Sequence, residues 1–118
     1  MGTHLNSLEM AIIEEIVSTK GEQYPLLKNH IPFLRVKSRE KTGVGVYVNF
    51  EYEEFQTLSK VTEMDDLVLT SEKSLELDVL QYGLNYELNL TKGRIAFLEL
   101  VTNGEHWDGI FGKFTFIE

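Results

Sequence analysis

Six side chains in two stretches of this sequence have the chemistry of a small binding or hydrolytic pocket. They are three carboxylates, one amide and two aromatic rings: Tyr47, Asn49, Glu51, Glu99, Glu105 and Trp107. Carboxylates in a cleft can exchange protons near neutral pH, while rings and amides hold a ligand by stacking and hydrogen bonding. Gly43 and Gly45 precede the first stretch, and strand glycines permit close approach by a ligand or another backbone. A pocket built from these residues is one of two functions that the sequence suggests.

The strands that must position Glu99 read as a hairpin. Residues 85–91 and 94–101 flank Lys92-Gly93, which suits a two-residue turn. Regular pairing from that turn predicts the pairs Leu90–Ile95, Leu88–Phe97 and Tyr86–Glu99. Because side chains alternate along a strand, this register directs Glu99 to the apolar side of the sheet. We therefore expect its carboxylate to be at least partly buried and hydrogen-bonded. The expected neighbours are Tyr47, Tyr86, Trp107 and the turn at residues 102–105.

Motifs of the common enzyme classes are missing from the sequence. The histidines, His4, His30 and His106, lack the spacing of a metal site, and the chain has no cysteine. It has no Gly-x-Ser-x-Gly nucleophile motif, and the glycines at 43 and 45 lack the third glycine of a dinucleotide fingerprint. His106 beside Glu105 could exchange protons, but a turn after a strand is an ordinary place for such residues. We expect no catalytic residue, metal or cofactor, and a protein that is more plausibly not an enzyme.

Negative charge is concentrated in one segment. The formal charge of the chain is −8, and residues 51–78 contain nine acids against two lysines. Within that segment Glu53, Glu54, Asp65 and Asp66 are the predicted acidic face for a partner. Acidic surfaces attract basic proteins and repel nucleic acid, so a basic protein partner is favoured and direct nucleic-acid binding is not. The alternative is a solvated surface that keeps the protein soluble.

Hydrophobic periodicity predicts the fold class. Residues 6–20 have a helical apolar stripe, with Asn6 and Glu9 placed as a capping box and Gly21 as the stop. After Pro32 the period changes to two, as in strands. The predicted strands cover residues 33–39, 44–52, 67–70, 75–79, 85–91, 94–101 and 114–117. The sequence thus predicts a single α+β domain over residues 1–118, with an N-terminal helix packed on an antiparallel meander sheet of about six or seven strands.

The apolar runs of the sequence are short and interrupted by charges, so we expect no membrane span. The first residues lack the basic region and long apolar stretch of a signal peptide. With no cysteine, disulfide stabilisation is not expected. We therefore expect a cytoplasmic protein.

Two separated motifs resemble those of a known group of proteins. The first, residues 38–51, reads Ser-Arg-Glu-Lys-Thr-Gly-Val-Gly-Val-Tyr-Val-Asn-Phe-Glu, and the second comprises Gly93-Arg94-Ile95, Leu98-Glu99 and Glu105-His106-Trp107. The chain resembles a family of small uncharacterised bacterial α+β proteins with a Ser-Arg-Glu-x-Thr-Gly-x-Gly hairpin and a Leu-Glu…Glu-x-Trp corner. The resemblance covers about 80 residues. It implies a compact bacterial domain of the sort that includes immunity-type inhibitors encoded beside toxins.

Two functions from different classes follow from the sequence. The leading hypothesis is a non-enzymatic protein-binding domain, such as an immunity protein that neutralises a basic toxin through an acidic face. The alternative is a small-ligand-binding or hydrolytic pocket that uses Glu99, Glu105, Trp107 and the hairpin at Gly43 and Gly45. Whether the corner of Glu99, Glu105 and Trp107 is structural or functional is left open by the sequence, as are the partner and the oligomeric state. A structural or homo-oligomeric protein without either activity is the third possibility.

Overall fold

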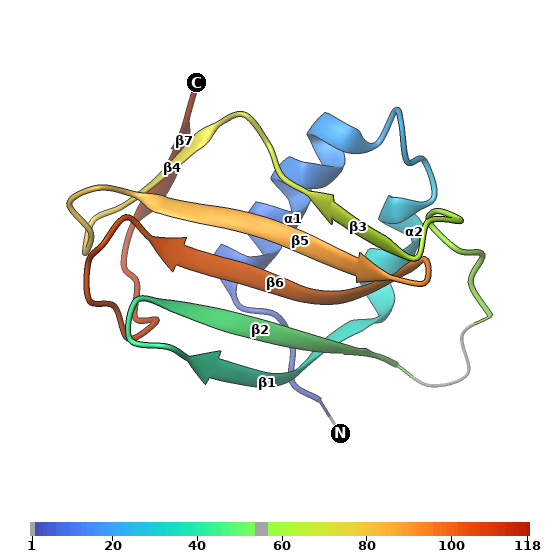
Figure 1. The fold of residues 1–118 in the computed structure, drawn as a ribbon, viewed down its shortest axis with the longest axis horizontal. Coiled ribbons are helices and arrows are strands. Elements are labelled where there is room, and N and C mark those ends of the chain that lie inside the picture. The colour runs from blue at the N-terminus through green and yellow to red at the C-terminus, as the bar shows by residue number, and fades with distance from the viewer. Residues whose placement is uncertain (1, 54–56) are drawn as a thin grey trace.

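The computed structural model describes residues 2–53 and 57–118. Its helices are α1 (Ser7–Lys20), α2 (Leu27–His30) and the 3-10 helix η1 (Ile31–Phe33). Its strands are β1 (Leu34–Lys41), β2 (Gly45–Tyr52), β3 (Asp66–Leu69), β4 (Ser74–Leu77), β5 (Leu84–Thr91), β6 (Arg94–Thr102) and β7 (Phe114–Ile117). All strand pairs are antiparallel. The predicted α+β class, with a helix on a sheet of about seven strands, is confirmed (Figure 1). Among the described helices, none has both the length and the apolar character to cross a bilayer.

Helix α1 begins at the predicted capping box. The Asn6 side chain accepts a hydrogen bond from the backbone N–H of Glu9, and the Glu9 carboxylate accepts one from the backbone N–H of Asn6, each 2.8 Å long. Glu9 lies in the apolar stripe, where it is only 2% exposed. Arg39 of β1 neutralises it with two hydrogen bonds, from Nε to Oε2 at 2.7 Å and from Nη2 to Oε1 at 2.8 Å. This bidentate pair joins the start of the helix to the sheet.

The strand order is β1-β2-β6-β5-β4-β7, and β3 pairs with β5 beside β4. Strand β6 therefore lies between β2 and β5, so the centre of the sheet unites segments that are distant in the chain. The buried side chains of these central strands share one face and pack with those of α1, as the alternating burial of each strand shows. They include Val46, Val48, Leu88, Leu98 and Leu100. The burial of these apolar side chains favours the position of β6 between β2 and β5.

The other face of the sheet carries polar and aromatic side chains and is called the outer face below. In Figure 1 the helix α1 lies behind the sheet, and no described element lies in front of it. The register places these residues on the outer face: Ser38 and Glu40 of β1, Tyr47, Asn49 and Glu51 of β2, Phe97 and Glu99 of β6, and Glu87 and Asn89 of β5. The described residues thus cover the sheet on one side only.

Candidate functional site

The hairpin turn forms as predicted, but the pairing of β5 with β6 beyond the turn differs from the predicted register. Lys92 and Gly93 both have positive φ, 52° and 78°, and Leu90 pairs with Ile95. A bulge then makes Asn89 pair with Phe97, so that Ala96 is the extra residue. From that point every side chain of β6 is on the opposite face from the one expected.

The bulge decides where Glu99 lies. Glu99 pairs with Glu87 and Tyr47, not with Tyr86, so the prediction that it faces the apolar side is wrong. The physical reason is that the bulge turns Leu98 and Leu100 inward, where they are 0% and 3% exposed. Burying two leucines stabilises the fold, whereas burying a carboxylate destabilises it.

Glu99 nevertheless has a partner on the outer face. The Tyr47 hydroxyl donates a hydrogen bond of 3.3 Å to Oε2 of Glu99, and both side chains are partly exposed. The negative charge of Glu99, together with this hydrogen bond, raises the pKa of the Tyr47 hydroxyl. The Tyr47 ring also meets Phe97 edge to face, with ring centroids 5.8 Å apart. The expectation of a partly buried and hydrogen-bonded carboxylate is thus met, on the opposite face.

Three carboxylates and Tyr47 form one line across four strands, which we call the acidic row. In order across β1, β2, β6 and β5 it consists of Glu40, Tyr47, Glu99 and Glu87. The salt bridges of the described residues join Arg35 to Glu53, Arg39 to Glu9 and Lys73 to Glu15, so none neutralises the row. Like charges directly opposite each other on paired strands are destabilising, and Glu87 and Glu99 are such a pair. The acidic row therefore contains an opposed pair of carboxylates that no salt bridge to a described basic residue neutralises.

The adjacent line of residues is polar and aromatic. It consists of Ser38, Asn49, Phe97 and Asn89. The Asn49 amide donates hydrogen bonds to Ser38 Oγ at 3.0 Å and to the Glu40 carboxylate at 3.1 Å. Asn49 thus orients a carboxylate of the acidic row. Tyr47, Asn49, Glu51 and Glu99, four of the six predicted site residues, share the outer face.

Trp107 and Glu105 lie elsewhere. Trp107 is 4% exposed on the helix side of the sheet, where its indole N–H donates to the Ile110 carbonyl at 2.9 Å. Its backbone N–H donates to the Gly43 carbonyl at 2.9 Å. The Glu105 carboxylate accepts the backbone N–H groups of Gln81 and Tyr82, both at 2.8 Å. These contacts fasten loops to strand ends, so the structure does not bring the six predicted residues into one pocket.

The two hairpin glycines have different surroundings. A Cβ on Gly45 would collide with the backbone carbonyl oxygen of Leu100. The close approach predicted at Gly45 is therefore made by the neighbouring strand β6. Gly43 has a φ of +93° and open space around its Cβ position, so its backbone conformation is what requires glycine.

Three of the acidic residues predicted as a partner face, Glu53, Asp65 and Asp66, lie near one end of the sheet, where β2 ends and β3 begins (Figure 1). Glu53 is exposed and its Oε2 atom lies 2.8 Å from Nη2 of Arg35, so its charge is partly neutralised. Asp65 and Asp66 are exposed, and neither is in a salt bridge with a described basic residue. Glu54 lies outside the described residues. Sequence reasoning missed Glu40 and Glu87. Glu87 lies within the strand predicted over residues 85–91, whereas Glu40 follows the strand predicted over residues 33–39 and lies in β1 only because that strand extends to Lys41.

Within residues 2–53 and 57–118, every buried polar side-chain atom has a hydrogen-bond partner. The same residues contain no group of three or more side chains suited to hold a metal ion. Comparisons of this chain with protein-family models, curated proteins and solved structures found no match. Function is therefore inferred from the geometry of the outer face.

Proposed function

We propose that this chain is a non-enzymatic protein-binding domain that binds a basic protein through the outer face of its sheet. An immunity protein that neutralises a basic toxin is a role of this kind, and it agrees with the family resemblance in the sequence. The observation that carries the proposal is the acidic row, three aligned carboxylates on a sheet face that no described element covers. The proposal keeps two expectations from the sequence, a bacterial origin and a cytoplasmic location.

The repulsion within the acidic row supports binding of a cation. Glu87 opposite Glu99 lowers the stability of the free protein, and lysine or arginine side chains of a partner would relieve that repulsion. Residues kept at a cost in stability are typical of functional surfaces. A purely solubilising surface has no need for two carboxylates in directly opposed positions.

The aromatic pair beside the acidic row supports a protein as the partner. Tyr47 and Phe97 are partly exposed and pack edge to face at the middle of the outer face. Aromatic residues near the centre of a surface, ringed by polar groups, are typical of the residues that contribute most to protein–protein binding. Asn49 and Asn89 flank the pair and offer amide groups to a partner.

The charge of the whole chain supports rapid association. At −8 it attracts a basic partner over distances longer than a contact, an effect that salt weakens. In this proposal Asp65 and Asp66 act at the rim of the interface and affect mainly the rate of association. The carboxylates of the acidic row make the direct contacts.

The alternative function, a small-ligand or hydrolytic pocket, has weaker support. Two residues on which it depends, Glu105 and Trp107, are engaged in contacts within the fold. The close approach at Gly45 is taken by β6. The remaining candidates lie on the exposed outer face, and none of them lines any of four cavities formed by the described residues.

The test compares two double variants with the same change in net charge. Glu40→Lys/Glu87→Lys alters the acidic row, whereas Glu22→Lys/Glu118→Lys alters exposed carboxylates elsewhere. A basic protein captured by the wild type should be retained by the second variant and lost by the first. Its association rate should fall with salt for the wild type. Equal capture by both variants, or an association rate indifferent to salt, would contradict the proposal.

A further inference from the structure

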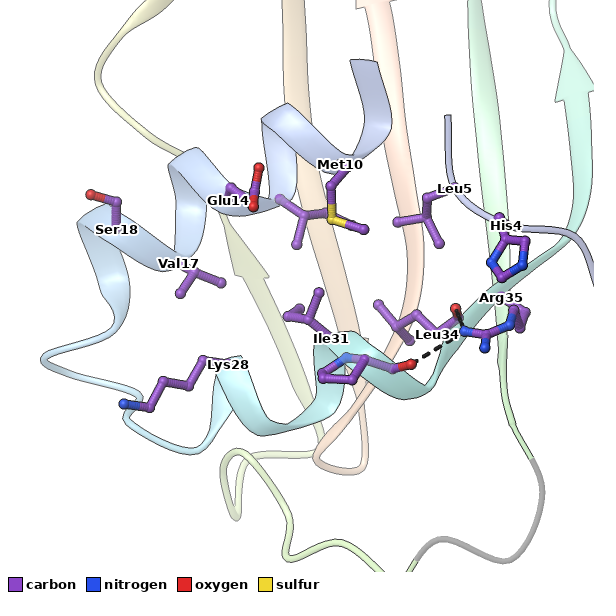
Figure 2. Close-up of a pocket in the computed structure, with 12 residues that line it drawn as sticks. His4, Leu5, Met10, Glu14, Val17, Ser18, Lys28, Ile31, Leu34 and Arg35 are labelled. Atoms are coloured by element: carbon purple, nitrogen blue, oxygen red, sulfur yellow. Dashed lines mark hydrogen bonds between the residues drawn. The ribbon is translucent and has the colours of Figure 1, made fainter. Parts of the chain in front are cut away.

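A groove separates helix α1 from the segment that follows α2. Its volume is about 740 Å³, within the range of small-molecule binding sites. Figure 2 shows apolar side chains that point into it from both walls. They are Leu5, Met10 and Val17 on one wall and Ile31 and Leu34 on the other. The groove lies on the helix side of the molecule, away from the outer face.

Helix α1 has two apolar stripes, and one of them faces the groove. Ile12, Ile13 and Ile16 form the first, which is fully buried, and Ile13 also lines the groove. Met10 and Val17 form the second, seven residues apart and so two turns along the same side of the helix, and both are partly exposed. Across the groove Ile31 is also partly exposed. No described element covers this second stripe, so it presents an elongated apolar surface to a ligand.

The polar groups lie at the ends and rim of the groove. Lys28 and Ser18 are at one end in Figure 2, His4 and Arg35 are at the other, and Glu14 lies on the α1 side. The wall thus has two permanent cations against one carboxylate, in a chain with a net charge of −8. Glu53 neutralises one of these cations, Arg35, so Lys28 is the cation of the wall without a described salt bridge.

The two cations are not equally available. The Arg35 guanidinium donates to the carbonyl oxygens of Pro32 and Leu34, at 3.2 and 2.7 Å, and to Glu53 at 2.8 Å. Lys28 is exposed, and no described carboxylate lies within 4 Å of its ammonium group. Lys28 is therefore the cation that can receive an anionic group, with the Ser18 hydroxyl at the same end.

We propose that this groove binds a free long-chain amphiphile with an anionic head group, such as a long-chain carboxylate. The aliphatic chain lies between α1 and η1, in contact with Met10, Val17 and Ile31. The head group meets Lys28. The apolar walls give affinity in proportion to the chain length, and the lysine selects a negative head group over a neutral one.

The experiment titrates the full-length protein with sodium octanoate, decanoate and dodecanoate below their micelle concentrations, followed by amide chemical shifts in two-dimensional NMR. Shifts should be confined to residues 4–18 and 28–35 and should saturate. Affinity should rise roughly threefold for each added methylene. Dodecanol, which has the same chain without charge, should bind more weakly than dodecanoate.

Two matched variants test the head-group contact. Lys28→Glu should weaken dodecanoate binding by roughly fivefold or more and leave dodecanol binding unchanged. Lys113→Glu has the same change in net charge away from the groove and should bind as the wild type does. A folded Val17→Asp variant should lose both ligands, and because Lys28 is exposed, the Lys28→Glu test stands even if Val17→Asp does not fold.

Three results would each overturn the proposal: no saturable binding below the micelle concentration, shifts centred outside the groove, or equal weakening by Lys28→Glu and Lys113→Glu. None of these results bears on the proposed binding of a basic protein, because the outer-face variant Glu40→Lys/Glu87→Lys changes no residue that lines the groove. Conversely, failure to capture a basic partner would leave the amphiphile site standing.

Discussion

Gly45 of β2 lies against the backbone of β6, with the Leu100 carbonyl oxygen in the place of a Cβ. We expect Gly45→Val to lower the free energy of unfolding by more than about 2 kcal/mol, since a backbone atom cannot move aside as a side chain can. Urea titration of the wild type and the variant measures the difference. Gly104 is the comparison, because it has open space around its Cβ position but a φ of +89°, so that Gly104→Val introduces backbone strain without a collision. A melting temperature of Gly45→Val within a degree or two of wild type would show that β6 can move away.

His30 forms a buried network that determines its protonation state. Its Nε2 atom lies 2.8 Å from the Ser59 carbonyl oxygen, which can only accept, so Nε2 carries the proton. Nδ1 then accepts a hydrogen bond of 2.8 Å from the Tyr52 hydroxyl, which itself accepts the backbone N–H of Ile95. Burial lowers the pKa of His30 below its ordinary value, and the charge of Arg94 lowers it further.

This network predicts a dependence of stability on pH. The unfolded chain takes up a proton at His30 more readily than the folded chain does, so the free energy of unfolding should decrease as pH falls below about 6.5, the ordinary value. Above that value the contribution is fully present. Urea titrations between pH 5 and 8 measure it, and His30→Gln should remove this part of the slope. An unchanged slope in the variant would mean that other groups cause it.

At the scale of elements, the bulge at Ala96 is what sets the face of each β6 side chain. It places Glu99 opposite Glu87, and the burial of Leu98 and Leu100 stabilises the fold by more than the repulsion of the two carboxylates destabilises it. The turn at Lys92-Gly93 is compatible with either register, because the two pairs next to it, Thr91 with Arg94 and Leu90 with Ile95, are common to both. Turn chemistry alone therefore cannot determine the pairing further along the hairpin.

The opposed pair predicts a stabilising substitution. Glu87→Lys converts a repulsive cross-strand pair into an attractive one, so the free energy of unfolding should rise by about 0.2–1 kcal/mol. Thermal or urea denaturation at low salt measures the gain, which should shrink at high salt. In Glu22→Lys, which changes the net charge equally on an exposed site, we expect no comparable gain. Loss of stability in Glu87→Lys would show that the carboxylate has a favourable contact of its own.

At the scale of the whole molecule, the Arg39–Glu9 pair joins the helix layer to the sheet layer. We expect Arg39→Met to destabilise the protein by about 2–3 kcal/mol, because it leaves the nearly buried Glu9 without a cation. Arg35→Met is the matched control, since its partner Glu53 is half exposed and an exposed pair contributes about 0–1 kcal/mol. Equal losses in the two variants, measured by urea titration, would contradict this ranking.

Local patterns were sufficient for much of the fold. The capping box of Asn6 and Glu9 and the turn at Lys92-Gly93 depend on neighbouring residues only, and both formed as expected. The alternation of apolar residues likewise identified the strands. The candidate site was predicted in part: Tyr47, Asn49 and Glu51 share a face because residues two apart in one strand must do so.

What the sequence by itself determined about this protein is its local structure, because caps, turns and periodicity arise from contacts within a few residues. Tertiary structure alone decided the bulge at Ala96, the entry of β6 beside β2 and the burial of Trp107 on the helix side. Each of these features depends on which apolar side chains, distant from one another in the sequence, are buried in the core. No single segment of the sequence specifies that choice. The acidic row follows from that choice, since Glu99 reaches the outer face only because Leu98 and Leu100 are buried.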